Sequence, residues 1–265
     1  MTALLRLAGI LILCLAGIWA RMYATQSFDP PPLVPGSLHS PIVAMELVRS
    51  PAEVRSLLRD PMGQHNRDVM RKQIRLDWLF IGTYWLLFSL LGLVLLNCRW
   101  PGARLLGVVV VLGAFAAAQW DIFEDLGILL VLDTPVGDLN ETMPATIRTA
   151  SLVKWGLLAL VEAGLAFLFL AYGRKEWFPR LLTTAAGLSF AAASILGLGG
   201  LFWNRAIEWS SLALSLGLLA ALLILLFAPG RFLAGIGAQG VEPGGPAPRL
   251  RPSPDRLLPQ PERMQ

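Results

Sequence analysis

The sequence predicts an all-α membrane protein: a polytopic bundle of six transmembrane helices, with a small extracytoplasmic segment between the first two. Hydrophobic residues make up 55% of the chain and charged residues only 15%, and the mean hydropathy is +0.60. Soluble domains carry about 25% charged residues. In addition, six separate apolar runs approach the ~20 residues that a helix needs to cross a bilayer. Both observations favour the same fold class.

The composition argues against a metal site, a structural disulfide and nucleic-acid binding. The two cysteines, Cys14 and Cys98, each lie in or beside an apolar run, and the only histidines are His39 and His65. No C-x-x-C or Cys/His ligand spacing occurs, so we expect neither a cofactor nor a metal. The net charge is +4, but the basic residues are concentrated in loops and tails. Such a distribution carries information on membrane topology and does not indicate nucleic-acid binding.

The first 20 residues are interpreted as a signal anchor or a cleaved signal peptide. Residues 4–20 form a short apolar run that is broken only by Arg6. Both interpretations fit this pattern, and cleavage would leave five spans in place of six.

Residues 21–76 are predicted to form the extracytoplasmic segment. A Pro-rich lead-in at 28–36 is followed by a predicted short strand at 41–48. Ser50, Pro51 and Glu53 then match an N-cap, a first helical position and a capping box, which predicts a helix through Leu58. In the basic stretch 65–75, Arg67, Arg71 and Arg75 share one helical face. We interpret that face as a collar facing solvent or lipid headgroups, with an anionic-lipid or anionic-substrate site as the alternative.

Residues 77–228 are predicted to hold the remaining spans, at about 77–97, 104–132, 150–172, 181–202 and 209–228. The span at 181–202 is rich in small residues, which allow helices to approach closely. Residues 229–265 are rich in Pro and Gly and are predicted to be a disordered cytoplasmic tail. The short loops with most Lys and Arg lie on the side of this tail, which places both termini in the cytoplasm. The eight basic residues of 21–76 conflict with that orientation, but the positive-inside rule weakens for long segments.

The candidate site is built around Asp121, Glu124 and Asp125, three carboxylates inside an otherwise apolar span. Their i, i+3, i+4 spacing places them on one helical face. Ionisable residues inside membranes are costly and mark functional sites by default. Carboxylates this close together repel, so at least one must be protonated or paired with a cation. The spacing alone does not choose between proton transfer, cation binding and acid–base catalysis.

Three further residues are expected near these carboxylates, on the outer side of the membrane. Asp77 opens the second span, Lys154 opens the fourth, and Arg205 lies in the turn before the sixth. Together with Asp121, Glu124 and Asp125, they form the predicted ligand-binding set. Glu162 lies about two helical turns deeper than Lys154. The competing interpretation is structural, because charges near helix ends also pair with one another or extend toward the headgroups.

Three stretches of the chain resemble a group of uncharacterised bacterial multi-pass membrane proteins. They are ELVRSPAE at 46–53, DWLFIGTY at 77–84 and DIFED at 121–125. The group's patterns look like E-L-A-x-[ST]-P-E-E, D-x-L-F-I-x-x-Y and D-x-x-E-N. Asp125 stands where the group has Asn, so no hydrogen-bonding role is carried over to it. The resemblance covers about residues 42–172 and implies a location in the bacterial inner membrane, without an activity.

Three functions stay open at this point. The first is binding or transport of a cation, a proton or a small amine through the acidic residues. The second is a membrane enzyme acting on a lipid, with Asp121 or Glu124 as the acid–base group and Arg205 or Lys154 holding an anionic headgroup. The third is a structural or assembly factor without catalysis. Membrane lipids are the expected surroundings in all three, and the sequence does not decide whether the protein is an enzyme.

Overall fold

All the regular secondary structure in the described parts of the chain is helical. The structure, a computed structural model, describes residues 1–29, 32, 38–58, 64–98, 101–171 and 177–237, and these ranges contain no strand. The helices are α1 (Thr2–Ala24), α2 (Pro41–Glu46), α3 (Pro51–Leu58), α4 (His65–Leu96), α5 (Pro101–Asp133), the 3-10 helix η1 (Val136–Asp138), α6 (Thr142–Leu170), α7 (Trp177–Gly200), α8 (Arg205–Phe227) and α9 (Pro229–Gly237).

Six of these helices, α1 and α4 to α8, are long and apolar enough to cross a membrane. Their outward faces carry large apolar side chains, and Leu105, Ile195 and Phe227 are among the most exposed. An exposed apolar surface of this extent is typical of a protein surrounded by lipid. The predicted helical polytopic bundle is therefore confirmed. Whether residues 1–20 are cleaved stays open.

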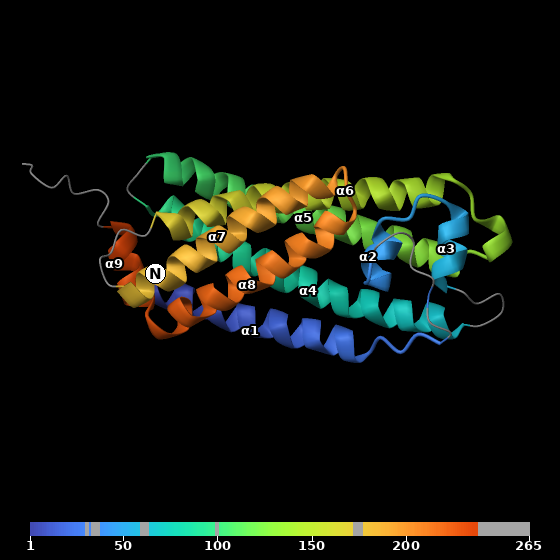
Figure 1. The fold of residues 1–265 in the computed structure, drawn as a ribbon, viewed down its shortest axis with the longest axis horizontal. Coiled ribbons are helices and arrows are strands. Elements are labelled where there is room, and N and C mark those ends of the chain that lie inside the picture. The colour runs from blue at the N-terminus through green and yellow to red at the C-terminus, as the bar shows by residue number, and fades with distance from the viewer. Residues whose placement is uncertain (30–31, 33–37, 59–63, 99–100, 172–176, 238–265) are drawn as a thin grey trace, which may run out of the picture.

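The six long helices form a closed ring in which α1 completes the circle. Helices α4 to α8 pack in chain order, and α1 lies against both α4 and α8. The start of α1 and the short helix α9 lie at one end of the bundle, whereas α2 and α3 lie at the other (Figure 1). Buried side chains such as Leu5, Phe88, Leu165 and Phe190 fill the interior of the ring.

Three of the long helices extend beyond the others at the α2/α3 end. Helices α4, α5 and α6 have 32, 33 and 29 residues, whereas α7 and α8 have 24 and 23. At ~1.5 Å per residue, α5 is about 50 Å long and α8 about 35 Å. Helix α2 contacts α5 and α6 and lies just beyond the end of α8 (Figure 1). It therefore covers the part of the bundle interior that the shorter helices leave open.

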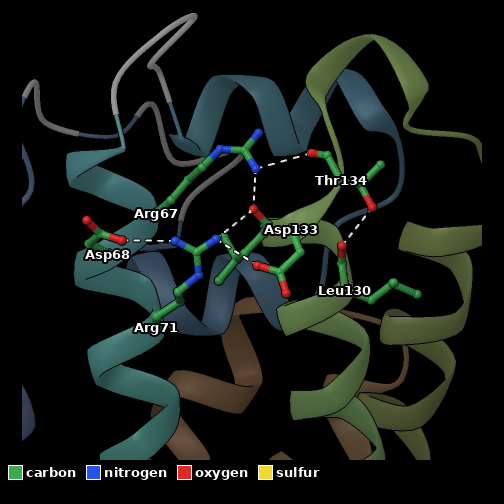
Figure 2. A network of polar contacts seen from close by, with 7 residues as sticks. Arg67, Asp68, Arg71, Leu130, Asp133 and Thr134 are labelled. Atoms are coloured by element: carbon green, nitrogen blue, oxygen red, sulfur yellow. Dashed lines mark hydrogen bonds and ion pairs between the residues drawn. The ribbon is translucent and has the colours of Figure 1, made fainter.

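The basic face of 65–75 has a structural role that the sequence did not indicate. Helix α4 begins at His65, so this stretch is the first part of the same helix as the predicted second span. Arg67 donates to the main-chain oxygens of Leu132 and Thr134, and Arg71 donates to Leu132 O and to the Asp133 carboxylate at 2.7 Å (Figure 2). Because the last carbonyls of a helix are partly negative, these guanidinium groups stabilise the C-terminal end of α5. The predicted collar thus binds α5 through two of its three arginines, while Arg75 is exposed.

Two predictions for the shorter elements were wrong. Residues 41–46, predicted as a strand, form helix α2, in which Ser40 Oγ accepts from Val43 N at 3.4 Å and Pro41 opens the helix. Ser40-Pro41 is the same start signal that the sequence repeats at Ser50-Pro51, and it outweighs local strand propensity. Residues 229–237, predicted as disordered, form α9, with Phe232 buried in the core. The rest of the predicted tail, 238–265, lies outside the described residues.

The predicted helix at 51–58 is confirmed as α3, with a variation in its cap. Glu53 N donates to Ser50 Oγ at 3.3 Å, as expected for an N-cap. The Glu53 carboxylate, however, accepts from Arg49 N at 2.7 Å, one residue before the position that a capping box uses. The two contacts still fix the chain where it enters α3.

Helices α4 and α5 touch closely at a pair of glycines. A Cβ on Gly107 would lie 2.7 Å from Leu96 N and 2.8 Å from Gly92 O, both main-chain atoms of α4. Main-chain atoms of a helix cannot shift here without moving the two helices apart. The glycine at 107 is therefore required by the close approach.

We predict that Gly107→Ala destabilises the bundle by about 1–3 kcal/mol through overpacking. Gly82→Ala in α4 is the matched control, because a Cβ there meets nothing within 4 Å. That substitution should be neutral or slightly stabilising, since Ala favours the helix by up to ~1 kcal/mol. Thermal unfolding of the two variants in the same detergent measures the difference. Equal melting temperatures would contradict the close approach.

Candidate functional site

The candidate site is a buried ammonium group in contact with three carboxylates from two helices. Lys154 Nζ in α6 lies 2.9 Å from Asp121 Oδ1 and 2.9 Å from Glu124 Oε2, both in α5, and 3.2 Å from Glu46 Oε2 in α2. All four side chains are at most 9% exposed. The contact with Asp121 is a hydrogen bond, whereas Glu124 Oε2 has no hydrogen-bond partner and meets Lys154 as an ion pair. We call Glu46, Asp77, Asp121, Glu124, Asp125 and Lys154 the acidic centre.

Two neutral donors hold the carboxylates of the acidic centre in place. Tyr84 in α4 donates its hydroxyl to Asp121 Oδ2 at 2.9 Å, so both oxygens of Asp121 are engaged. The indole of Trp155 donates to Glu46 Oε2 at 3.3 Å. Burial raises the pKa of Glu46, and the Lys154 ammonium opposes that shift. The site therefore joins α2, α4, α5 and α6.

Asp125 and Asp77 complete the acidic centre without contacting Lys154. Asp125 is 2% exposed, and its Oδ2 has no hydrogen-bond partner. Asp77, half-buried in α4, is close enough for its charge to act on Asp125, Asp121 and Glu46. A second pair of acidic groups therefore lies beside the lysine cluster, with no cation assigned to it.

The acidic centre has a surplus of negative charge. Five carboxylates and one ammonium would leave four negative charges if every carboxyl were ionised. An uncompensated charge in a low-dielectric interior is strongly unfavourable. Carboxyl groups in such an environment become neutral by binding protons. The chemistry available to the site is therefore the binding and release of protons.

Helix α2 covers the acidic centre and is held at both ends by side chains of the bundle. Glu208 Oε1 in α8 accepts from His39 N at 2.7 Å and from Ser40 N at 2.8 Å, at the start of α2. Arg148 in α6 donates to Leu47 O at 2.9 Å, at the end of α2. An anion at the N-terminus and a cation at the C-terminus both complement the helix dipole. We call these contacts the α2 clamp.

The predicted residues are only partly brought together. Asp121, Glu124 and Lys154 are in direct contact, and Asp125 and Asp77 lie beside them. Arg205 is half-buried and makes no ion pair with the acidic centre in the described structure, so its predicted part in the site stays a prediction. Its neighbour Asn204 accepts from Arg148 at 3.4 Å. In the first turn of α8, which begins at Arg205, it is Glu208 that makes contact with the start of α2.

Glu46 is the member of the site that sequence reasoning missed. It follows the apolar residues of α2 and was assigned to a predicted strand outside the membrane. The available signal was its place at the start of the ELVRSPAE stretch, the first part of the resemblance to bacterial multi-pass proteins. A buried role required knowing that α2 folds back onto α5 and α6.

Within the described residues, no group of three His, Cys, Asp or Glu side chains is arranged to hold a metal ion. Comparison with models of protein families, with curated proteins and with solved structures finds no match to this chain. The resemblance to bacterial inner-membrane proteins therefore stays a prediction. The function has to be inferred from the geometry of the acidic centre.

We predict that Lys154→Met destabilises the protein by about 3–5 kcal/mol at neutral pH, because three carboxylates lose their counter-charge. The loss should shrink as the pH falls, since protonation removes the repulsion that the lysine normally offsets. Thermal unfolding between about pH 5 and pH 8 measures both effects. Arg205→Met is the control and should change stability by no more than about 0.5 kcal/mol. A pH-independent loss in Lys154→Met would contradict the charge balance.

We predict that Glu208→Ala loosens α2, at a cost of about 1–2 kcal/mol for the lost helix cap. Hydrogen exchange of the amides at 39–47 should accelerate, whereas exchange within α6 should stay slow. Glu208→Gln keeps an acceptor oxygen and should retain most of the protection. If the alanine variant exchanges as slowly as the wild type, the α2 clamp does not depend on Glu208.

Proposed function

We propose that this integral membrane protein binds and exchanges protons at the acidic centre and couples that exchange to transport across the membrane. The observation that carries the proposal is the gathering of five carboxyl groups, four of them buried, around one ammonium. Such a site changes its charge readily, because each proton gained or lost alters a strongly interacting group. Buried carboxylates in transmembrane segments are a recurrent feature of proton relays.

Protons are favoured over metal ions or free amines because of Lys154. Its ammonium already occupies the position between Glu46, Asp121 and Glu124 that a bound cation would take. A second cation there would meet strong repulsion at ~3 Å. Protonation of Glu124 or Asp125 needs no such space. Lys154 is likewise enclosed by acidic groups, which leaves it unsuited to hold an anionic lipid headgroup.

The α2 clamp supports an exchange of protons that can be opened and closed. The acidic centre lies level with the turn between α7 and α8, because Trp155 O is 3.7 Å from the position of a Cβ on Gly197. Helix α2 covers this level on the side of the α2/α3 end of the bundle (Figure 1). Release of α2 would expose Glu46 first. Access to the acidic centre would then depend on the contacts of Glu208 and Arg148.

A structural role is the second candidate, and the same clamp favours it. The acidic centre and the α2 clamp together hold five helices, α2, α4, α5, α6 and α8, at one place. A protein of this kind would present α2 and α3 as a fixed platform for a partner protein. It would keep the same protonation state over the physiological pH range.

Proton uptake by the purified protein tests the proposal. We predict that wild-type protein takes up protons when acidified from about pH 9 to pH 5, and that Glu124→Gln and Asp125→Asn each take up fewer. Each substitution keeps the shape of the side chain while removing a proton-binding group. Glu141→Gln, in an exposed position, is the control for ordinary surface titration.

The result separates the two candidates. Reduced uptake in both cluster variants, together with normal folding, supports proton exchange. If Glu124→Gln and Asp125→Asn take up as many protons as Glu141→Gln but are less stable, the structural role is supported.

A further inference from the structure

Glu162 is a second buried acidic group, deeper in the bundle and separate from the acidic centre. It lies in α6, is 1% exposed, and neither of its carboxyl oxygens has a hydrogen-bond partner among the residues that the structure describes. It follows Lys154 by eight residues, which is ~12 Å along the helix axis. A carboxyl group at this depth without any partner is unusual, because buried polar side chains are almost always hydrogen-bonded.

No counter-charge faces Glu162 from the helices packed around it. Helix α5 carries no charged residue between Arg104 and Asp121, and α7 carries none between Leu181 and Gly200. In α4 the only titratable side chain after Asp77 is Tyr84, which is bonded to Asp121. In α6 itself, none follows Glu162. An ionised carboxylate at this place would have no opposite charge near it. The stable form of Glu162 is therefore the neutral, protonated carboxyl.

Glu162 shares a face of α6 with residues that pack against α7. Its same-face neighbours one turn back are Leu158 and Ala159. Ala159 contacts α7, where Ser194 donates its hydroxyl to Ala159 O at 2.8 Å. On the other side of α7, Ser210 of α8 donates its hydroxyl to Ala193 O at 2.8 Å. Both hydroxyls are buried, and each keeps acceptor capacity beyond the bond it donates.

We propose that Glu162 is a second proton-binding site, which receives its proton from the acidic centre. This inference rests on the proposed function for the source of the proton. In the transfer, Glu162 first releases its proton toward the opposite end of the bundle and becomes a carboxylate. A neutral carboxyl of the acidic centre then loses a proton and becomes a carboxylate beside Lys154, while the Glu162 carboxylate takes up that proton and is neutral again. Glu162 lies about two helical turns from Lys154 along α6, farther than a hydrogen bond reaches, so the proposed transfer requires water molecules between the two sites. Glu162 then marks the direction of proton movement, from the α2/α3 end toward the opposite end of the bundle.

A purely structural carboxyl would behave differently when replaced. A structural group would have a partner, and its removal would leave that partner unsatisfied. Glu162 has none, so the apolar variant Glu162→Met should fold at least as stably as the wild type. Leu158→Met, one turn away on the same face, is the control for a change of packing alone. Higher or equal thermal stability in Glu162→Met, together with loss of proton movement, distinguishes a functional carboxyl from a structural one.

Infrared spectroscopy of the purified full-length protein tests the protonation of Glu162 directly. The spectrum at neutral pH should contain a carbonyl band of a protonated carboxyl that Glu162→Gln removes. The same band should persist in Glu124→Gln and Asp125→Asn. A Glu162→Gln spectrum identical to the wild type in this region, or a marked fall in the melting temperature of Glu162→Met relative to Leu158→Met, would overturn the assignment.

Proton movement into vesicles separates this inference from the proposed function. With an imposed membrane potential and a trapped pH-sensitive dye, wild-type vesicles should acidify, and Glu162→Gln vesicles should respond like protein-free ones. Loss of flux in the cluster variants but not in Glu162→Gln overturns Glu162 as a station on the path and leaves the proposed function intact. Absence of flux in the wild type overturns the transfer to Glu162. Proton binding at the acidic centre is then still tested separately, by the proton-uptake measurement.

Discussion

The structure depends on the ion pairs that Lys154 makes with Asp121, Glu124 and Glu46. Bringing an ammonium out of water costs several kcal/mol, and only close contact with opposite charge offsets that cost. The contacts therefore fix how far α5 and α6 slide along one another. They also give α2, which has only six residues, a reason to fold onto the bundle. Removal of any one carboxylate leaves the other two still paired, which makes the arrangement tolerant of proton exchange.

The difference in helix length explains where this interaction lies. Helices α4, α5 and α6 are long enough to continue beyond the level at which α7 turns into α8. The acidic centre is placed at that level, where the apolar surroundings of the membrane interior end. A site deeper in the bundle would be costlier to ionise, as Glu162 illustrates. A site farther out would be open to water and would not hold a surplus of carboxyl groups.

Much of the fold was predictable because the bilayer imposes a simple pattern. Apolar runs of sufficient length identify the six spans, and the i, i+3, i+4 spacing of Asp121, Glu124 and Asp125 places them on one face. Lys154 was predicted to lie near them, and it contacts two of the three. Helix α2 was missed because six residues are too few to show helical periodicity. The only sequence signal for it is Ser40-Pro41 at its start. Glu46 and Glu208 were not predicted in their roles because each acts across more than 100 residues of sequence, a distance that no local pattern reports.

The role of Arg205 shows the limit of reasoning from depth alone. Its position in the turn between α7 and α8 is close to the level of Lys154, as expected. Depth, however, does not fix the direction in which a side chain points around its helix axis. At the same turn, the carboxylate of Glu208 is directed to the start of α2, and the amide of Asn204 accepts from Arg148. The polar residues of this turn therefore serve α2 and leave the acidic centre to α4, α5 and α6.

The closure of the ring by α1 has a consequence for the biogenesis of the protein. During synthesis α1 enters the membrane first and α8 last among the spans, yet the two are neighbours in the finished ring. Gly9 in α1 lies directly against Leu226 near the end of α8, and a Cβ at Gly9 would come within 2.6 Å of that leucine. The ring therefore cannot close before α8 has been made. Until then, the side of α1 that faces α8 in the finished ring has no partner helix packed against it.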